Sequence, residues 1–278
     1  MGILDLTTVL KFKSWYDFKG NNADDALIAD LIAQRSMDIL AYLGRKTVLK
    51  TTYTEYYNGT GTGRLMLRQW PVIEVNSMTI DGVTVASATP PNTGFFIPPF
   101  DGFPPGSPGV IALNGSGFGG AYPVPGFCAG SNNVYISYVA GYAVEDEART
   151  IPAAPYAITA AQPYGMWARD DGVTNAATGN PLTVTTGTPA TGQYTVNDGV
   201  YTFAAADTGV AVLLNYSYVP FTLESACREA VGERYSYRQH IGQTSQSMMG
   251  QTTTSYDNKG LTDFVKKMIH PFKMMVPN

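Results

Sequence analysis

The hydrophobic period of the chain changes at Gly44, and this change constrains the fold more than any other feature of the sequence. Between residues 22 and 43 apolar residues recur every three or four positions, which predicts an amphipathic helix. After Gly44 apolar and polar residues alternate, and Val, Ile, Thr and Tyr become frequent, as is typical of β-strands. The chain is therefore expected to combine helices with sheets.

The first predicted helix has recognisable ends. Asn22 is the expected N-cap, Asp24 and Asp25 place negative charge in the first turn, and Gly44 follows the last turn. Its apolar stripe consists of Leu27, Ile28, Leu31, Ile32, Ile39, Leu40 and Leu43. A weaker helical pattern precedes it, over residues 6–18.

Strong alternation predicts strands over residues 47–59, 64–82 and 132–142, with a tight hairpin turn at Asp81-Gly82. Residues 84–132 are dense in Gly and Pro, and we expect a long surface excursion there. Residues 150–219 contain short alternating segments with turn signals about every ten residues, which indicates a small sandwich or barrel.

The helical period returns at Pro220. Thr222 is the expected N-cap of a helix that buries Leu223, Ala226, Cys227, Ala230 and Val231. A polar stretch over 241–260 follows, and we expect it to order only against neighbouring subunits. A last short helix is predicted to bury Leu261, Phe264, Val265, Met268 and Ile269 before Pro271 limits it.

These patterns predict an α+β fold, in which N- and C-terminal helices form a helical bundle beside an antiparallel sheet or hairpin. The expected core comprises residues 1–149 and 220–278. Residues 150–219 would form an inserted all-β, sandwich-like domain.

The sequence shows little that would support catalysis. His240 and His270 are the only histidines, and Cys128 and Cys227 belong to no metal-binding pattern, so these thiols are expected to be free. In Asp170-Asp171, neighbouring strand residues face opposite ways, which disfavours a shared acid–base site and leaves a weak cation-binding turn as the alternative. We therefore expect a protein that is not an enzyme, with no cofactor and no metal.

Charge and hydropathy limit the partners further. Charged residues make up 14% of the chain and the net charge is -4, which argues against general nucleic-acid affinity but leaves room for a local basic patch. No stretch approaches the roughly 20 apolar residues of a membrane span, so no membrane partner is expected.

The segment "YYNGTGTGRLMLRQWPV" begins at Tyr56 and at first resembles a phosphate-binding loop. A Walker loop, however, needs GxxxxGK followed by Ser or Thr at the start of a helix. Here the glycines at 59, 61 and 63 lie between two strand-like segments, with neither a Lys nor a helix after them. The run is therefore predicted to be a flexible strand-to-strand connection.

Four segments, taken in order, resemble the head–tail connector (adaptor) proteins of long-tailed bacteriophages and gene-transfer particles. The segments are "YTEYYNGTGTGRLMLRQWPVIEVNSMTIDG", "VYISYVAGYAV", "PFTLESACREAVGERYSYRQHIGQTSQS" and "LTDFVKKMIHPFK". In the first, the matching residues are Leu65, Leu67, Trp70-Pro71-Val72, Val75, Ser77, Met78 and Asp81-Gly82. The segment 150–219 departs from the family, whose members pass almost directly from the Ala-Gly-Tyr turn to the helix.

The resemblance implies a virion structural protein at the neck between head and tail, made in the host cytoplasm. Such adaptors form a homo-oligomeric ring, usually dodecameric, beneath the portal protein. The ring receives a stopper or tail-completion protein and lets DNA pass, with transient, non-specific contact.

By this resemblance the C-terminal residues Phe272, Lys273, Met274 and Met275 are candidates for portal binding; a packed or frayed terminus is the alternative. Candidate contacts with a neighbouring subunit or the tail are Gly59, Gly61, Gly63, Arg64 and Trp70. Arg228, Arg234 and Arg238 are candidate channel-lining residues, with solvated or ion-paired roles as the alternative.

A second hypothesis is a virion protein whose β module binds carbohydrate on a surface. Its aromatic platform would consist of Trp167, Tyr164, Tyr201 and Phe203, although alternating aromatics also suit a core.

Overall fold

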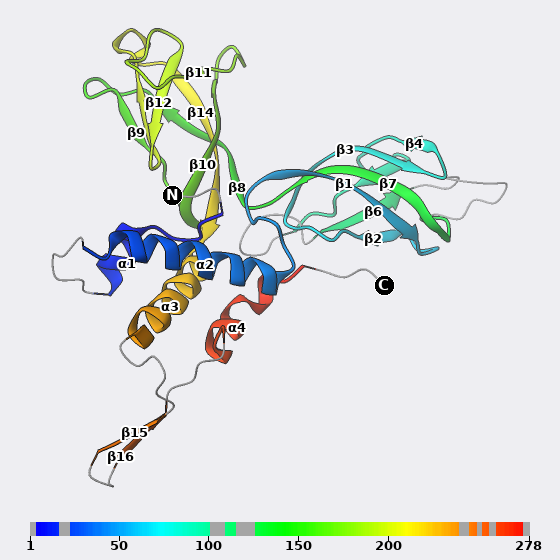
Figure 1. Cartoon of the computed structure of the whole chain (residues 1–278). Helices are drawn as coiled ribbons and strands as arrows, with labels where there is room; N and C mark the ends of the chain where they lie inside the picture. The colour runs from blue at the N-terminus through cyan, green and yellow to red at the C-terminus, as the bar shows by residue number, and fades with distance from the viewer. Residues whose placement is uncertain are drawn as a thin grey trace. The chain divides into compact units, whose positions relative to one another are not determined.

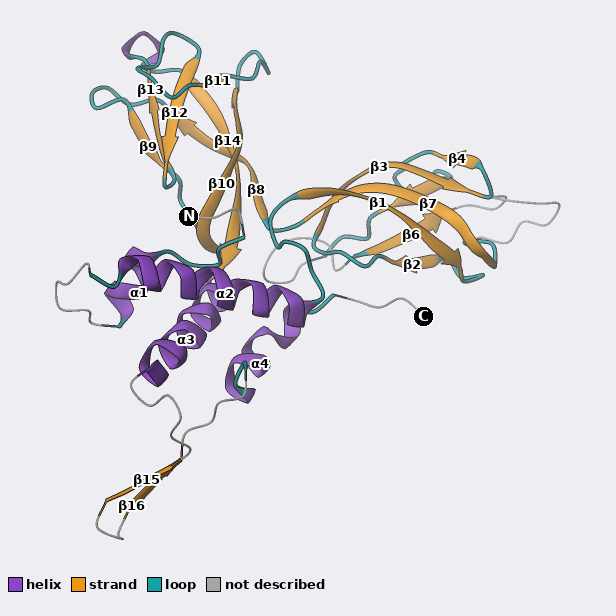
Figure 2. Ribbon diagram, viewed as in Figure 1, coloured by secondary structure: helices purple, strands orange, loops and turns teal. Residues whose placement is uncertain are grey.

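The computed structural model describes residues 4–16, 23–100, 109–114, 126–238, 245–248, 252–255 and 260–274 (Figure 1). Strands make up 40% of these residues, and 16 strands form five sheets. Only four α-helices occur among the described residues (Figure 2). The expected helical bundle is therefore wrong, and the protein is mostly β. The helical patterns are genuine, but they cover far fewer residues than the strands.

The chain divides into two compact units. Unit 1 comprises Met1–Thr47 and Val219–Lys273, and unit 2 comprises Val48–Tyr218 and Met274–Asn278. The sequence instead predicts a core of residues 1–149 and 220–278 with an inserted domain of residues 150–219. That division differs from these two units and stays a prediction.

Unit 1 contains the helices α1 (Val9–Trp15), α2 (Asp25–Leu43), α3 (Phe221–Tyr237) and α4 (Asp263–Ile269), followed by the 3-10 helix η3 (His270–Phe272). Helix α3 contacts both α2 and α4, and α1 contacts α2. The stripe predicted for α3 is fully buried, as is that of α2 except for Leu27. The 3.6-residue period thus identified the buried faces of both long helices.

The starts of α2 and α3 differ from the prediction. Asn22 lies outside the described residues, and the N-cap of α2 is Asp24, whose side chain makes no capping hydrogen bond. Helix α3 begins at Phe221 with Pro220 as its N-cap, so Thr222 already lies inside the helix. Proline fixes φ near the value that a helix start requires, which explains the earlier beginning.

The first sheet of unit 2 has the order β1-β7-β3-β4, with all neighbours antiparallel. Its strands are β1 (Thr51–Gly59), β7 (Gly130–Ala140), β3 (Val72–Ile80) and β4 (Val83–Val85). Asp81 and Gly82 both have positive φ, 49° and 79°, which confirms the hairpin turn between β3 and β4.

A three-stranded sheet of order β2-β6-β5 shares one apolar core with this sheet. It consists of β2 (Arg64–Met66), β6 (Val110–Asn114) and β5 (Gly94–Phe96). The expected excursion over 84–132 is thus partly wrong, since β5 and β6 lie within it. Such strands, of three and five residues, are too short to show an alternating pattern among so many Gly and Pro residues.

The remaining part of unit 2 contains two sheets that share a second apolar core. One has the order β10-β14-β8, from β10 (Gly165–Asn175), β14 (Ala211–Pro220) and β8 (Ala143–Thr150). The other has the order β11-β12-β13-β9, from β11 (Thr183–Val184), β12 (Gln193–Asn197), β13 (Val200–Phe203) and β9 (Ala157–Thr159). A short 3-10 helix, η1 (Ala205–Asp207), precedes β14.

Within the polar stretch 241–260, β15 (Ser245–Met248) pairs antiparallel with β16 (Thr252–Ser255). Among the described strands these two pair only with each other. The expectation that residues 241–260 order only against neighbouring subunits stays a prediction.

The glycine run connects β1 to β2, and backbone hydrogen bonds fix it in place. Gly61 N donates to Phe127 O at 2.6 Å, and Phe127 N donates to Thr62 O at 2.8 Å. A Cβ atom at Gly59 would overlap the backbone carbonyl of Cys128. The run is therefore a closely packed connection rather than a loose one.

We expect Gly59→Ala to lower the free energy of unfolding by about 1–3 kcal/mol, because the added methyl group forces two backbone segments apart. Gly187→Ala is the matched control, since a Cβ there meets nothing within 4 Å, and it should stay within about 0.5 kcal/mol of wild type. Urea unfolding measures both. Equal stability of the two variants would contradict the close packing at Gly59.

Candidate functional site

The C-terminal candidates lie in different surroundings. Phe272 is buried, and Lys273 Nζ lies 5.4 Å from the centre of the Tyr42 ring, both within unit 1. Met274, in unit 2, accepts a hydrogen bond at Sδ from Gln69 Nε2 at 3.3 Å. Met275 lies outside the described residues. Phe272 is therefore packed within unit 1 rather than exposed to a partner.

The candidates near the glycine run lie in unit 2. Gly63 O accepts a hydrogen bond from Leu113 N at 2.9 Å, and Arg64 is exposed on β2. Trp70 is half-buried, and its ring meets that of Tyr142 edge-on at 6.1 Å. Of the five candidates, only Gly61 and Arg64 are exposed, whereas Gly59, Gly63 and Trp70 are half-buried. The accessible part of the connection is therefore its middle, around Gly61, together with Arg64.

The three candidate arginines of α3 do not form one cluster. Arg228 Nε lies 3.5 Å from the buried Glu224, and Arg234 lies over the Tyr237 ring. Arg238 pairs with Asp24 at 3.0 Å. This ion pair and the hydrogen bond from Tyr235 hold the pKa of Asp24 below its usual value. The ion-paired role therefore describes Arg228 and Arg238, and a channel lining by these arginines stays a prediction.

Two of the four residues expected to form an aromatic platform for carbohydrate are buried and cannot contact a ligand at the surface. Tyr201 and Phe203 are buried in the second core of unit 2, and Trp167 donates from Nε1 to the Tyr201 hydroxyl at 3.2 Å.

Asp170 and Asp171 face different partners, as expected for adjacent strand residues. Asp170 accepts hydrogen bonds from Tyr194 and Tyr201, whereas Asp171 accepts one from Ser217.

Tyrosine hydroxyls that donate to carboxylates recur in both units, a feature that the sequence reasoning missed. Tyr57 and Tyr138 both donate to Glu55, and the Tyr138 bond is 2.7 Å long. Tyr216 donates to Glu147 at 2.6 Å, and Tyr235 donates to Asp24. Apart from Tyr57 and Glu55, which are two residues apart on β1, the paired residues are far apart in the sequence, so no local pattern signals these pairs.

Neither the thiols nor an acidic cluster suggests reactive chemistry. Both cysteines are free, and burial raises the pKa of the Cys227 thiol to about 12, so it is protonated at neutral pH. Within the described ranges, no group of three His, Cys, Asp or Glu side chains could hold a metal ion. None of the described helices is long and apolar enough to cross a membrane.

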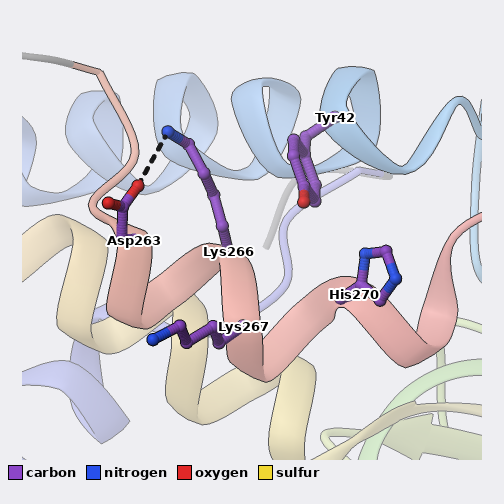
Figure 3. A pocket seen from close by; sticks show the side chains of 5 residues that line it. All are labelled: Tyr42, Asp263, Lys266, Lys267 and His270. Atoms are coloured by element: carbon purple, nitrogen blue, oxygen red, sulfur yellow. Dashed lines mark hydrogen bonds and ion pairs between the residues drawn. The ribbon is translucent and has the colours of Figure 1, made fainter.

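A hollow of about 200 Å³ lies in unit 1 and is lined by Tyr42, Asp263, Lys266, Lys267 and His270 (Figure 3). Tyr42 comes from α2, and the other four residues come from α4 and η3. Lys266 Nζ lies 3.4 Å from Asp263 Oδ1.

Large apolar side chains are exposed mainly on unit 1. Of the 14 exposed ones among the described residues, eight belong to this smaller unit. Leu10 on α1 is 75% exposed, Met37 on α2 60% and Phe264 on α4 61%. The predicted burial of Phe264 is therefore wrong, because α4 turns this residue away from Val265 and Ile269, which are buried.

No protein-family model matches the chain, and a search of curated proteins finds no match. The resemblance to head–tail connectors therefore remains an expectation.

The buried tyrosines predict a steep loss of stability in alkali. Burial raises the pKa of Tyr57, Tyr138, Tyr194, Tyr201, Tyr216 and Tyr218. Their stabilising contribution is fully present below the unfolded pKa of about 10 and is lost as pH rises towards the raised folded values. Each of these buried tyrosines should lower the free energy of unfolding by about 1.4 kcal/mol per pH unit above about pH 10.

Ultraviolet absorbance of tyrosinate, recorded together with circular dichroism, tests this expectation. Part of the 18 tyrosines should ionise only as the fold is lost. Smooth ionisation of all of them near pH 10, with circular dichroism unchanged, would contradict it.

Proposed function

We propose that the protein is a phage head–tail connector, a virion structural protein at the neck that assembles into a ring, usually dodecameric in such proteins. The observation that carries the proposal is the exposure of large apolar side chains on all four helices of unit 1: Leu10, Trp15, Leu27, Met37, Phe221 and Phe264. Exposed apolar surface of this kind favours contact with other protein chains.

Helix α1 shows the feature most clearly. This seven-residue helix buries Phe12 but exposes Leu10 and Trp15, and Tyr16 directly after it is also exposed. The Trp15 and Tyr16 rings lie 6.2 Å apart and both pack near Phe12. Phe12 thus anchors a short helix that leaves Leu10 largely exposed to a partner, whereas the Tyr16 hydroxyl is hydrogen-bonded to Ser236.

A ring also requires two different contact surfaces on each subunit, because head-to-tail contacts join unlike surfaces. Exposed apolar residues on several helices, rather than on one, suit this requirement. The portal and a stopper protein are the further partners of the proposal, and passing DNA would make transient contact. The proposal includes no catalytic step and no cofactor.

Negative-stain electron microscopy of the purified protein, alone and with portal, tests the proposal. We expect rings, and we expect Leu10→Lys to reduce ring formation at least tenfold, because a charge replaces an apolar contact. Val184→Lys is the matched control, since Val184 is exposed on β11 in unit 2. Monomers of wild-type protein that ignore the portal would contradict the proposal.

The portal contact of the C-terminus can be tested separately by truncation after Lys273. This variant keeps the buried Phe272 and removes Met274 and Met275. We expect portal binding to weaken at least tenfold while the thermal unfolding of unit 1 stays unchanged. Unchanged portal binding in a pull-down or titration would contradict a docking role of these methionines.

A further inference from the structure

The first sheet of unit 2 carries two cross-strand rows of side chains that all bear a hydroxyl group. Residues opposite one another on neighbouring antiparallel strands point to the same face of a sheet. One row consists of Tyr56 on β1, Tyr135 on β7, Thr79 on β3 and Thr84 on β4 (Figure 1). The next row consists of Thr54, Ser137 and Ser77 on β1, β7 and β3. These seven residues are called the hydroxyl face.

The hydroxyl face lies on the solvent side of its sheet. The residues that follow or precede its members, such as Tyr57, Ile136 and Met78, are buried in the first core. Successive side chains of a strand point to opposite faces, so the hydroxyl face is turned away from that core. Tyr56 is 55% exposed, and each of the other six residues is exposed or half-buried.

The hydroxyl groups of this face are available to a ligand. None of the seven side chains makes a hydrogen bond with another residue in the part of the chain that the structure describes. On the core face, by contrast, the hydroxyls of Tyr57 and Tyr138 both donate to Glu55. A hydroxyl group donates one hydrogen bond and accepts up to two. The sheet thus presents donors and acceptors in a fixed array.

The hydroxyl face contains no charged residue; Glu74 lies on the following row, opposite Val139. Binding of a polyanion requires lysines or arginines, which the face lacks. Serine and threonine, four of its seven members after the two tyrosines and Thr84 are set aside, are under-represented among the residues that dominate protein–protein binding. A neutral ligand rich in hydroxyl groups therefore matches this face in charge and in hydrogen-bonding capacity.

Tyr56 and Tyr135 add an aromatic surface to the array. Their ring centres lie 5.1 Å apart, with the planes inclined by 57°. Such a ring offers an apolar face on which the C–H face of a sugar packs, while its hydroxyl reaches a polar group. At the free edge of β1, Arg68 Nη1 donates to Tyr56 O at 3.3 Å. This carbonyl already has a partner, which disfavours pairing with a strand of another chain.

We propose that the hydroxyl face binds a neutral, extended oligosaccharide. Tyr56 packs against a sugar ring, and the hydroxyls of Tyr135, Thr54 and Ser137 exchange hydrogen bonds with the sugar hydroxyls. A flat sheet suits a flat chain that lies across its strands, such as a chain of β-1,4-linked hexoses. The site lies outside residues 150–219, where the sequence placed an aromatic platform, and it does not rest on the proposed function.

Isothermal titration calorimetry of the full chain tests the proposal. The probes are cellohexaose and β-1,4-mannohexaose, with the β-1,4-mannuronate hexamer as their negatively charged counterpart. We expect at least one neutral probe to bind, and the mannuronate hexamer to bind at least tenfold more weakly than mannohexaose. Tyr56→Ala should weaken binding at least tenfold, whereas Tyr56→Phe keeps the ring and should stay within about threefold of wild type.

The pair of Tyr56 and Tyr135 also stabilises the sheet, so thermal unfolding is recorded for every variant. Thr54→Val/Ser137→Ala leaves both rings in place and should weaken binding about fivefold or more, because two hydrogen-bonding hydroxyls are lost. Thr183→Val is the matched control: it removes an exposed threonine hydroxyl from β11 and should leave binding unchanged.

The proposal is overturned if neither neutral probe binds, or if the mannuronate hexamer binds as tightly as mannohexaose. It is also overturned if Thr54→Val/Ser137→Ala and the control bind equally well. Self-association that Tyr56→Ala abolishes, without any saccharide binding, would make the face a contact between copies and would overturn it too. Rings formed by a protein that binds no saccharide would refute this inference alone.

Discussion

The first core of unit 2 depends on one carboxylate, that of Glu55. Tyr57 and Tyr138 both donate hydrogen bonds to Glu55 Oε2, and both hydroxyls also accept from the backbone. Arg68 N donates to Tyr57 at 3.0 Å, and Gln69 N donates to Tyr138 at 3.3 Å. Tyr138 lies on the central strand β7, opposite Tyr53 of β1 and Val75 of β3. Glu55 thus ties the edge strand β1 to the sheet centre and to the segment that leads into β3.

The same solution recurs at Asp170, Glu147 and Asp24, each of which accepts from at least one tyrosine. In these pairs the aromatic ring fills the core while the hydroxyl reaches a carboxylate at its margin. The hydrogen bond satisfies a buried polar group that would otherwise be costly. In this way a chain with 14% charged residues and 18 tyrosines places several aromatic rings in its cores while their hydroxyls remain hydrogen-bonded.

Local features of the fold were predictable, whereas long-range ones were not. The stripes of α2 and α3 and the turn at Asp81-Gly82 follow from periodicity and turn chemistry, which act over a few residues. The bond between Tyr138 and Glu55 joins residues 83 positions apart, and the strands β5 and β6 form only through pairing with each other and with β2. The predicted fold class was wrong because local sequence patterns do not reveal such long-range strand pairings. In the hollow of about 200 Å³ in unit 1, Lys266 and Lys267 were visible in the sequence, but the approach of Tyr42 from α2 was not.

The Glu55 carboxylate and the hydroxyls of Tyr57 and Tyr138 hold the first core of unit 2 together. A double-mutant cycle with Glu55→Gln and Tyr138→Phe, read from urea unfolding of unit 2, tests it most directly. Because a hydrogen bond to a charged group contributes about 1.5–3 kcal/mol and Glu55 is partly exposed, we predict a coupling free energy of at least about 1 kcal/mol between the two positions. Additive effects, with a coupling below about 0.5 kcal/mol, would contradict the account.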